Sequence, residues 1–222
     1  MIDLLIEFSN LLIQGLYMTI VITVISFSLG FLISSILTLI RFFAPETLGL
    51  LVRAYIDVFR GTPLLVQILL IYFGLPSIGI KLDAVTSAVL AIGLNSGAYQ
   101  SEIFRTSLKG IPEEQIVLAK ALGFSDTQSY RYVILPQAVR NAAPALVNEF
   151  VTLLKESSLA SVIGVAELTR VGEYMTAATF RALEAYFLIA LVYLVLSYIS
   201  SRVARYIEKI SAVPGFERWS AI

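Results

Sequence analysis

The chain of 222 residues contains no cysteine and no histidine. Without cysteine it cannot form a disulfide or use a thiol nucleophile, and without histidine it has no imidazole general base. Most transition-metal sites need one of these two side chains, so such sites are excluded as well. We therefore expect no catalytic residue, no metal site and no bound cofactor in this chain.

Charged residues are also scarce, at 14% of the chain, whereas 58% of the residues are hydrophobic and the mean hydropathy is +0.84. The apolar share exceeds that of ordinary soluble domains. Lys and Arg balance Asp and Glu at 16 each, and no basic block of five residues occurs, so nucleic acid is not an expected partner. The composition predicts an all-α integral membrane protein.

The hydropathy pattern predicts about five transmembrane helices in one domain that spans residues 1–222, because a spanning helix needs about 20 mainly apolar residues. The N-terminal segment contains no Lys or Arg and no cleavage motif, so we expect the first helix to be retained. Glu149 and Lys155 interrupt the fourth helix. The predicted helices cover residues 8–40, 50–73, 83–108, 138–156 and 184–207.

The one sizeable polar insertion, residues 109–137, lies between the third and fourth helices. Its composition predicts two short helices joined at Gly123. Positive side chains collect on the cytoplasmic side of short loops. Eleven of the sixteen Lys and Arg residues lie on the insertion's side if the N-terminus is outside, which predicts a cytoplasmic insertion and a cytoplasmic C-terminus. These are Arg41, Arg53, Arg105, Lys109, Lys120, Arg131, Arg140, Arg202, Arg205, Lys209 and Arg218.

The first helix carries a stripe of small residues at steps of three or four, which places them on one face. Small faces allow helices to pack closely in lipid, so we interpret this stripe as a packing face, with contact to a substrate as the alternative. The stripe consists of Gly15, Thr19, Thr23, Ser26, Gly30 and Ser34.

The second helix contains a polar island at residues 55–67. Pro63 lacks a backbone donor and can kink the helix. Asp57 and Arg60 are three residues apart and are expected either to pair with each other or to line a transport route.

Polar residues recur on one face of the third helix and on one face of the fourth. A charge at membrane depth costs about 2.5–3.5 kcal/mol on insertion scales, so it is directed toward a partner, water or ligand. Glu102 and Glu156 lie near helix ends, whereas Glu149 lies deeper and is the stronger functional candidate. The candidate substrate-binding residues are Asp57, Asn95, Tyr99, Glu102, Glu149 and Thr152.

The insertion resembles the cytoplasmic coupling loop of bacterial ABC importer permeases of type I. The similarity rests on Gly-Ile-Pro-Glu-Glu-Gln at 110–115, Ala-Lys-Ala-Leu-Gly at 119–123 and Ile-Leu-Pro at 134–136. Segments 55–67, 98–105 and 148–159 resemble the polar amino-acid branch of that family, which includes histidine, arginine and glutamine importers. The resemblance covers nearly the whole chain.

One part of the loop departs from the family pattern. Val117, Leu118 and Ala119 stand where family members commonly have Glu-Ala-Ala, and Glu114 stands at a common glycine. A salt bridge from the missing glutamate is therefore not expected. The resemblance still implies docking to an ATPase through Ala119, Ala121, Leu122 and Gly123.

The family implies a bacterial inner-membrane complex of two permease chains, expected to be a homodimer, with two cytoplasmic ATPases and an extracytoplasmic amino-acid-binding protein. No Gly-x-x-x-x-Gly-Lys-Ser/Thr motif occurs, so ATP and Mg²⁺ belong on the ATPase chain and the permease is not an enzyme. The acidic Glu149 favours a cationic amino acid as substrate. The alternatives are a secondary transporter, which often contains inverted repeats, and a channel-like membrane protein without an ATPase.

Overall fold

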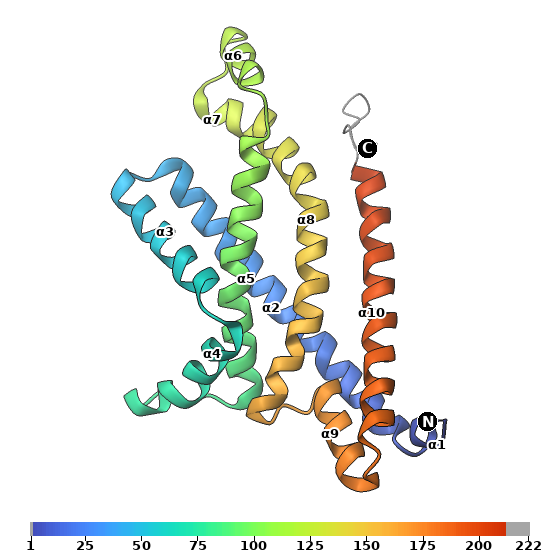
Figure 1. The fold of residues 1–222 in the computed structure, drawn as a ribbon. Coiled ribbons are helices and arrows are strands. Elements are labelled where there is room, and N and C mark those ends of the chain that lie inside the picture. Colours follow the sequence, from blue (N-terminus) through green and yellow to red (C-terminus); the bar gives the residue numbers. More distant parts are fainter. Residues whose placement is uncertain (1, 212–222) are drawn as a thin grey trace.

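The computed structural model describes residues 2–211, which are almost entirely helical and contain no β-strand. The all-α class is therefore confirmed for the described chain. Figure 1 shows long helices side by side with short helices at both ends of the bundle. In chain order the α-helices are α1 (Ile2–Glu7), α2 (Ser9–Phe43), α3 (Glu46–Gly61), α4 (Leu64–Leu69), α5 (Ala84–Lys109), α6 (Glu113–Ala121), α7 (Asp126–Ser129), α8 (Leu135–Glu156), α9 (Leu168–Thr179) and α10 (Ala182–Ser211).

Two helices of the described chain are each long and apolar enough to cross a membrane, namely the spans Ser9–Arg41 in α2 and Ala182–Val203 in α10. Their positions agree with the first and fifth predicted helices. The third and fourth predicted helices correspond to α5 and α8, which have 26 and 22 residues but carry more polar side chains. The π-helical turn Tyr130–Ile134 precedes α8 and lengthens it toward the α6 end.

The second predicted helix is not one helix with a kink but two helices with a break. Residues Glu46–Gly61 and Leu64–Ile78 are bent by 104° relative to each other, and the second part ends in π and 3₁₀ turns. Thr62 has extended backbone, with φ −116° and ψ 145°. The residue before a proline is driven from the helical region by the proline ring, which explains the break before Pro63.

The small residues of α2 form a packing face against α5 and α9. Thr19, Thr23, Ser26 and Ser34 are 0% exposed. A Cβ atom added at Gly15 would lie 2.7 Å from Val171 of α9. The packing interpretation of this stripe is therefore confirmed.

Close approach of α5 to α2 also depends on glycines of α5 itself. A Cβ atom at Gly93 would lie 2.6 Å from Leu29, and one at Gly97 would lie 2.8 Å from Ile33. Such distances are shorter than carbon atoms tolerate, so the two helices contact each other along backbone that carries no side chain.

The two ends of the bundle differ in character. The short helices α6 and α7 lie at one end, together with the C-terminal end of α10, whereas α1 and α9 lie at the opposite end (Figure 1). Gly123 connects α6 to α7 in a left-handed turn with φ +87°, as predicted for the junction of the insertion. The arrangement puts α1 and the end of α10 on opposite sides of the bundle, but which side faces the cytoplasm stays a prediction.

Helix α9 was not predicted from the sequence. Glu167 precedes it and is 0% exposed, and its carboxylate accepts hydrogen bonds from the backbone N–H groups of Thr169 (2.8 Å) and Arg170 (2.9 Å). The hydroxyl of Tyr193 on α10 donates a third, at 2.7 Å. Because glutamate is not a common N-cap residue, the start of this helix carries no standard sequence signal.

Candidate functional site

Four polar residues near the middle of α5 form a polar level: Asn95, Ser96, Tyr99 and Gln100. On one side, this polar level contacts α3 and α4, the two helices of the broken span. The side-chain amide of Asn95 is buried and donates to the carbonyl of Phe59 (2.9 Å) and to Oε1 of Gln67 (3.0 Å). Gln67 in turn donates to the carbonyl of Phe59 and to the hydroxyl of Thr62, at 2.9 and 2.7 Å. The break at Pro63 leaves carbonyl groups without helical partners, and these amides satisfy them. Asn95 therefore holds α3 and α4 in their bent arrangement.

On its other side the same level of α5 contacts α8. Oε1 of Glu149 accepts a hydrogen bond from the hydroxyl of Ser96 at 2.8 Å. Ser96 accepts from Nε2 of Gln100 at 2.9 Å, and Gln100 also donates to the carbonyl of Phe27 on α2 at 3.2 Å. Ser96 and Gln100 are both 0% exposed. One chain of hydrogen bonds therefore connects α2, α5 and α8 and ends on a carboxylate.

Glu149 is half-buried, and its second oxygen makes no hydrogen bond with any described residue. Lys155 could have neutralised it, but Lys155 is exposed and makes no ion pair within the part of the chain that the structure describes. Thr152 lies one turn further along α8 and is also half-buried. An ionised carboxylate has room for several donors, so Glu149 has acceptor capacity left for a ligand.

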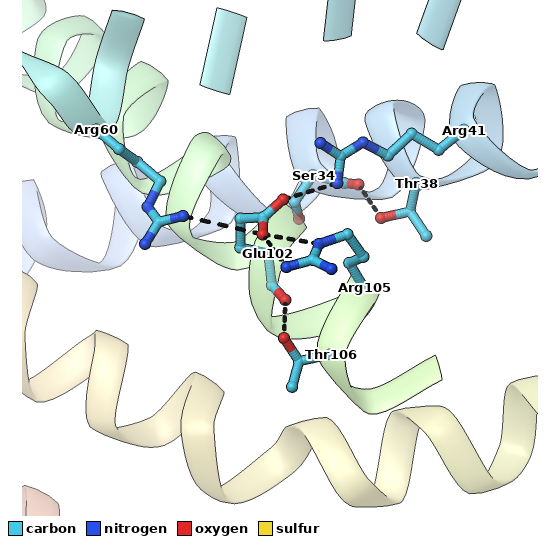
Figure 2. A network of polar contacts seen from close by, with 7 residues as sticks. All are labelled: Ser34, Thr38, Arg41, Arg60, Glu102, Arg105 and Thr106. Atoms are coloured by element: carbon cyan, nitrogen blue, oxygen red, sulfur yellow. Dashed lines mark hydrogen bonds and ion pairs between the residues drawn. The ribbon is translucent and has the colours of Figure 1, made fainter. Parts of the chain in front are cut away.

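Glu102 lies further along α5 and is bound by arginines of its own chain. Figure 2 shows Arg41, Arg60 and Arg105 around its carboxylate. Arg41 lies 2.7 Å from Oε1, Arg105 lies 2.6 Å from Oε2, and Arg60 lies 3.9 Å from Oε2. The side chain of Glu102 is 17% exposed. Its charge is therefore already compensated, and it has little acceptor capacity left for a substrate.

Asp57 does not pair with Arg60, so this part of the prediction is wrong. Arg60 turns instead toward α5, where its guanidinium lies 5.1 Å from the centre of the Tyr99 ring. Asp57 is exposed and lines a cavity of about 580 Å³ between the α2–α3 turn and the end of α5, together with Glu102 and Lys109. The structure thus places Asn95, Tyr99, Glu149 and Thr152 near the middle of the bundle and Asp57 and Glu102 toward the α6 end.

Several residues of this polar level were not singled out from the sequence. Ser96 and Gln100 are four residues apart on α5 and adjoin Asn95 and Tyr99, so their spacing carried a signal. Arg105 is three residues from Glu102 on α5, so this spacing also carried a signal. Arg41 carried none, because its pairing with Glu102 depends on how α2 and α5 pack. A second cavity, of about 350 Å³, has an apolar lining from α2, α8 and α10 that includes Phe27, Phe150 and Ile199.

The α6 end presents an apolar surface. Val117, Leu118 and Leu122 are 66%, 62% and 72% exposed, and Ala121 is exposed beside them. Ala119 is only 4% exposed. Of the residues predicted to dock onto an ATPase, Ala121, Leu122 and Gly123 are therefore exposed and Ala119 is buried, and the docking itself stays a prediction.

Membrane-length helices, a broken span and buried polar side chains at mid-bundle are the architecture of an integral membrane protein. Residues 29–210 match the family model described as the binding-protein-dependent transport system inner membrane component, and the chain belongs to this family. It is a multi-pass inner-membrane permease subunit of an ABC importer, is not an enzyme, and depends on a partner chain for ATP hydrolysis. Family membership favours this assignment over a secondary transporter or a channel.

Curated relatives align along nearly the whole chain. The glutamine transport system permease protein GlnP of Escherichia coli K12 is 39% identical over 201 residues, which are 90% of this chain and 92% of that protein. The arginine transport system permease protein ArtQ of Bacillus subtilis is 37% identical over 199 residues, covering 89% and 91% of the two chains.

Two solved transporter structures resemble the fold of this chain. A crystal structure of an amino acid ABC transporter with histidines matches with a TM-score of 0.89 and 39% identity, over 93% of this chain and 96% of that one. An inward-facing structure of the MetNI methionine ABC transporter matches with a TM-score of 0.78, over 93% and 99% of the two chains. At 20% identity the second match supports the fold alone.

Proposed function

We propose that this permease imports cationic amino acids, such as arginine, lysine or histidine, and that Glu149 binds the positive group of their side chain. The relatives named above are glutamine and arginine permeases, which supports an amino acid as the substrate. The observation that carries the cationic assignment is the Glu149 carboxylate at mid-bundle, which accepts one hydrogen bond from Ser96 and no other from residues 2–211.

The chemistry of Glu149 suits a guanidinium, ammonium or imidazolium group. A charge-assisted hydrogen bond is short and about twice as strong as a neutral one. Tyr99 and Thr152 lie near Glu149 along the bundle axis. Tyr99 offers an aromatic face and Thr152 offers a hydroxyl. Asn95 shapes the site because its hydrogen bonds stabilise the break between α3 and α4. We assign Asp57 and Glu102 to the path toward the α6 end rather than to direct contact with the amino acid.

Removing the charge at Glu149 tests this proposal. In the complex of permease, ATPase and binding protein, Glu149→Gln keeps the shape of the side chain and loses the charged partner. Hydrogen bonds to charged groups contribute about 1.5–3 kcal/mol, so arginine affinity should fall about 10- to 100-fold. Arginine-stimulated ATP hydrolysis should fall far more than basal hydrolysis.

The matched control is Glu173→Gln, which removes a carboxylate that pairs with Arg170 on α9, away from the polar level. This variant should respond to arginine as the parent does. An unchanged arginine response in Glu149→Gln, or a parent stimulated only by neutral or acidic amino acids, would contradict the cationic assignment.

We further propose the assembly that this family suggests: two copies of this chain, two cytoplasmic ATPases and an extracytoplasmic binding protein. In this assembly the apolar surface of Val117, Leu118, Ala121 and Leu122 docks onto the ATPase, with the α6 end in the cytoplasm. Closure of the ATPases would then move α6 and open the path alternately to each side of the membrane.

A further inference from the structure

An imported amino acid carries an α-carboxylate as well as a side chain, and Glu149 repels that carboxylate. A donor with positive charge must therefore lie within the length of one amino acid from Glu149, or the substrate enters the bundle with an uncompensated charge. Such a charge is costly at membrane depth.

Arg60 has the surplus charge that this role requires. Both oxygens of Glu102 already bind closer partners, Arg41 at 2.7 Å and Arg105 at 2.6 Å, whereas Arg60 stays at 3.9 Å. Three guanidinium groups thus share one carboxylate, and Arg60 is the one that makes no close hydrogen bond to it. The side chain of Arg60 is 44% exposed, the largest exposed fraction of the three arginines.

Arg60 and Glu149 lie at nearly the same height along α5. Arg60 contacts Tyr99, and Glu149 contacts Ser96. These two positions of α5 differ by three residues, which is about 4.5 Å along the helix axis and about 60° around it. The two charged groups therefore approach adjacent faces of one helix, Arg60 from α3 and Glu149 from α8.

Around α5, Tyr99 lies in the sector between Asn95 and Ser96, and this sector is open. Within residues 91–100, all of which are described, Tyr99 is the one exposed residue, at 39%. Asn95 and Ser96, on either side of this sector, are buried against the broken span and α8. A ligand that lies over Tyr99 would reach Arg60 with one end and Glu149 with the other.

We propose that Arg60 binds the α-carboxylate of the transported amino acid, while the ring of Tyr99 supports the guanidinium of Arg60. A guanidinium presents a planar fork of donors that matches a carboxylate in bidentate geometry. Arg60 comes one residue before the end of α3. Because the helix ends there, no further helical turn covers the side chain of Arg60. This inference rests on the proposed amino-acid substrate but not on a cationic side chain, because every amino acid carries an α-carboxylate.

The test measures binding to the purified permease–ATPase complex without the binding protein, so that recognition by the binding protein does not enter. Radiolabelled arginine is displaced by unlabelled arginine or by agmatine, which is arginine without its carboxylate. In the parent, agmatine should bind at least about tenfold more weakly than arginine, as expected for loss of a charged hydrogen bond. In Arg60→Gln the two ligands should bind about equally, because arginine loses its advantage.

Two further variants separate a direct contact from a loosened structure. Arg60→Lys keeps the charge without the fork and should restore part of the preference for arginine over agmatine. Arg53→Gln removes another guanidinium of α3, which lines the cavity beside Glu102 but makes no ion pair with it, so it should retain the parent's preference. An unchanged preference in Arg60→Gln, or an equal loss in Arg53→Gln, would overturn the assignment of Arg60.

Failure of the cationic assignment has a different signature. If the parent binds glutamine but not arginine, Glu149 does not select a cation, and the Arg60 comparison is made with glutamine and its decarboxylated analogue, 4-aminobutanamide. If the parent binds no amino acid, the proposed substrate class and the role of Arg60 are both wrong.

Discussion

Ser96 is the residue through which α5 controls the carboxylate of Glu149. Its hydroxyl donates to Glu149 at 2.8 Å and accepts from Gln100 at 2.9 Å, so it fixes both the position of the acid and the orientation of the amide. Ser96→Ala should therefore leave the charge of Glu149 in place but free its side chain to move.

We expect Ser96→Ala to weaken arginine binding by about 3- to 10-fold, less than loss of the charge itself, because the substitution keeps the charge of Glu149 and only frees its position. Equilibrium binding to the permease–ATPase complex measures this change. Ser87→Ala is the matched control, because Ser87 is equally buried on α5 and its hydroxyl makes no hydrogen bond. Equal weakening by both substitutions would mean that packing of α5, not the contact with Glu149, explains the effect.

Single polar residues in apolar runs were the part of the site that the sequence could predict. Asn95 and Glu149 stood out because a polar group at membrane depth needs a partner. The partner itself depends on how the helices rotate against each other. For that reason the sequence left two alternatives for Arg60, pairing with Asp57 along α3 or lining a transport route, whereas in the structure it faces Tyr99 and Glu102 on α5.

At the scale of elements, the loop between α6 and α7 gives the most direct test of coupling to the ATPase. Gly123 has φ +87°, and a Cβ atom added there would meet no atom within 4 Å. Gly123→Trp should leave the bundle folded but place a large side chain beside the exposed Leu122. We expect loss of ATPase copurification or of transport-coupled ATP hydrolysis.

Gly79→Trp provides a closely matched control for backbone strain. Gly79 also has a left-handed conformation, with φ +88° and no atom within 4 Å of an added Cβ, but it lies beyond α4 and away from the α6 end. The two variants should therefore be similarly strained and differ in coupling. Normal coupled transport in Gly123→Trp would remove this loop from the docking surface.

Among the elements, helices with long apolar runs were predicted closely, whereas interruptions were not. The first and fifth predicted helices agree with α2 and α10 because their apolar runs decide both existence and length. The break at Pro63 was expected to be a kink. A full break is stabilised by Asn95, which belongs to α5, and by Gln67, which folds back onto the carbonyl of Phe59, and neither contact is evident before the helices are packed. Helix α9 was missed since its N-cap is an uncommon one.

At the scale of the whole molecule, the prediction that remains open is the orientation in the membrane. Figure 1 places α6 and the end of α10 at one end and α1 at the other. The distribution of Lys and Arg predicts that the α6 end is cytoplasmic. Because the chain has no native cysteine, single cysteines report the side without background labelling.

We expect Asp3→Cys to react with a membrane-impermeant thiol reagent in intact cells, and Ser125→Cys to react only after the membrane is opened. Both positions are exposed in the structure, so accessibility to the reagent depends on the side of the membrane. Labelling of Ser125→Cys in intact cells, with Asp3→Cys protected, would reverse the orientation.

The central claim is that this chain is the permease of an ATP-driven importer for cationic amino acids. Uptake of radiolabelled arginine into proteoliposomes, which contain the permease with its ATPase and are supplied with the binding protein, tests it most directly. We expect uptake that requires ATP inside the vesicles, exceeds uptake of neutral and acidic amino acids, and is lost in Glu149→Gln. Uptake that proceeds without ATP, or that is as rapid for glutamate as for arginine, would show that the chain is not such a permease.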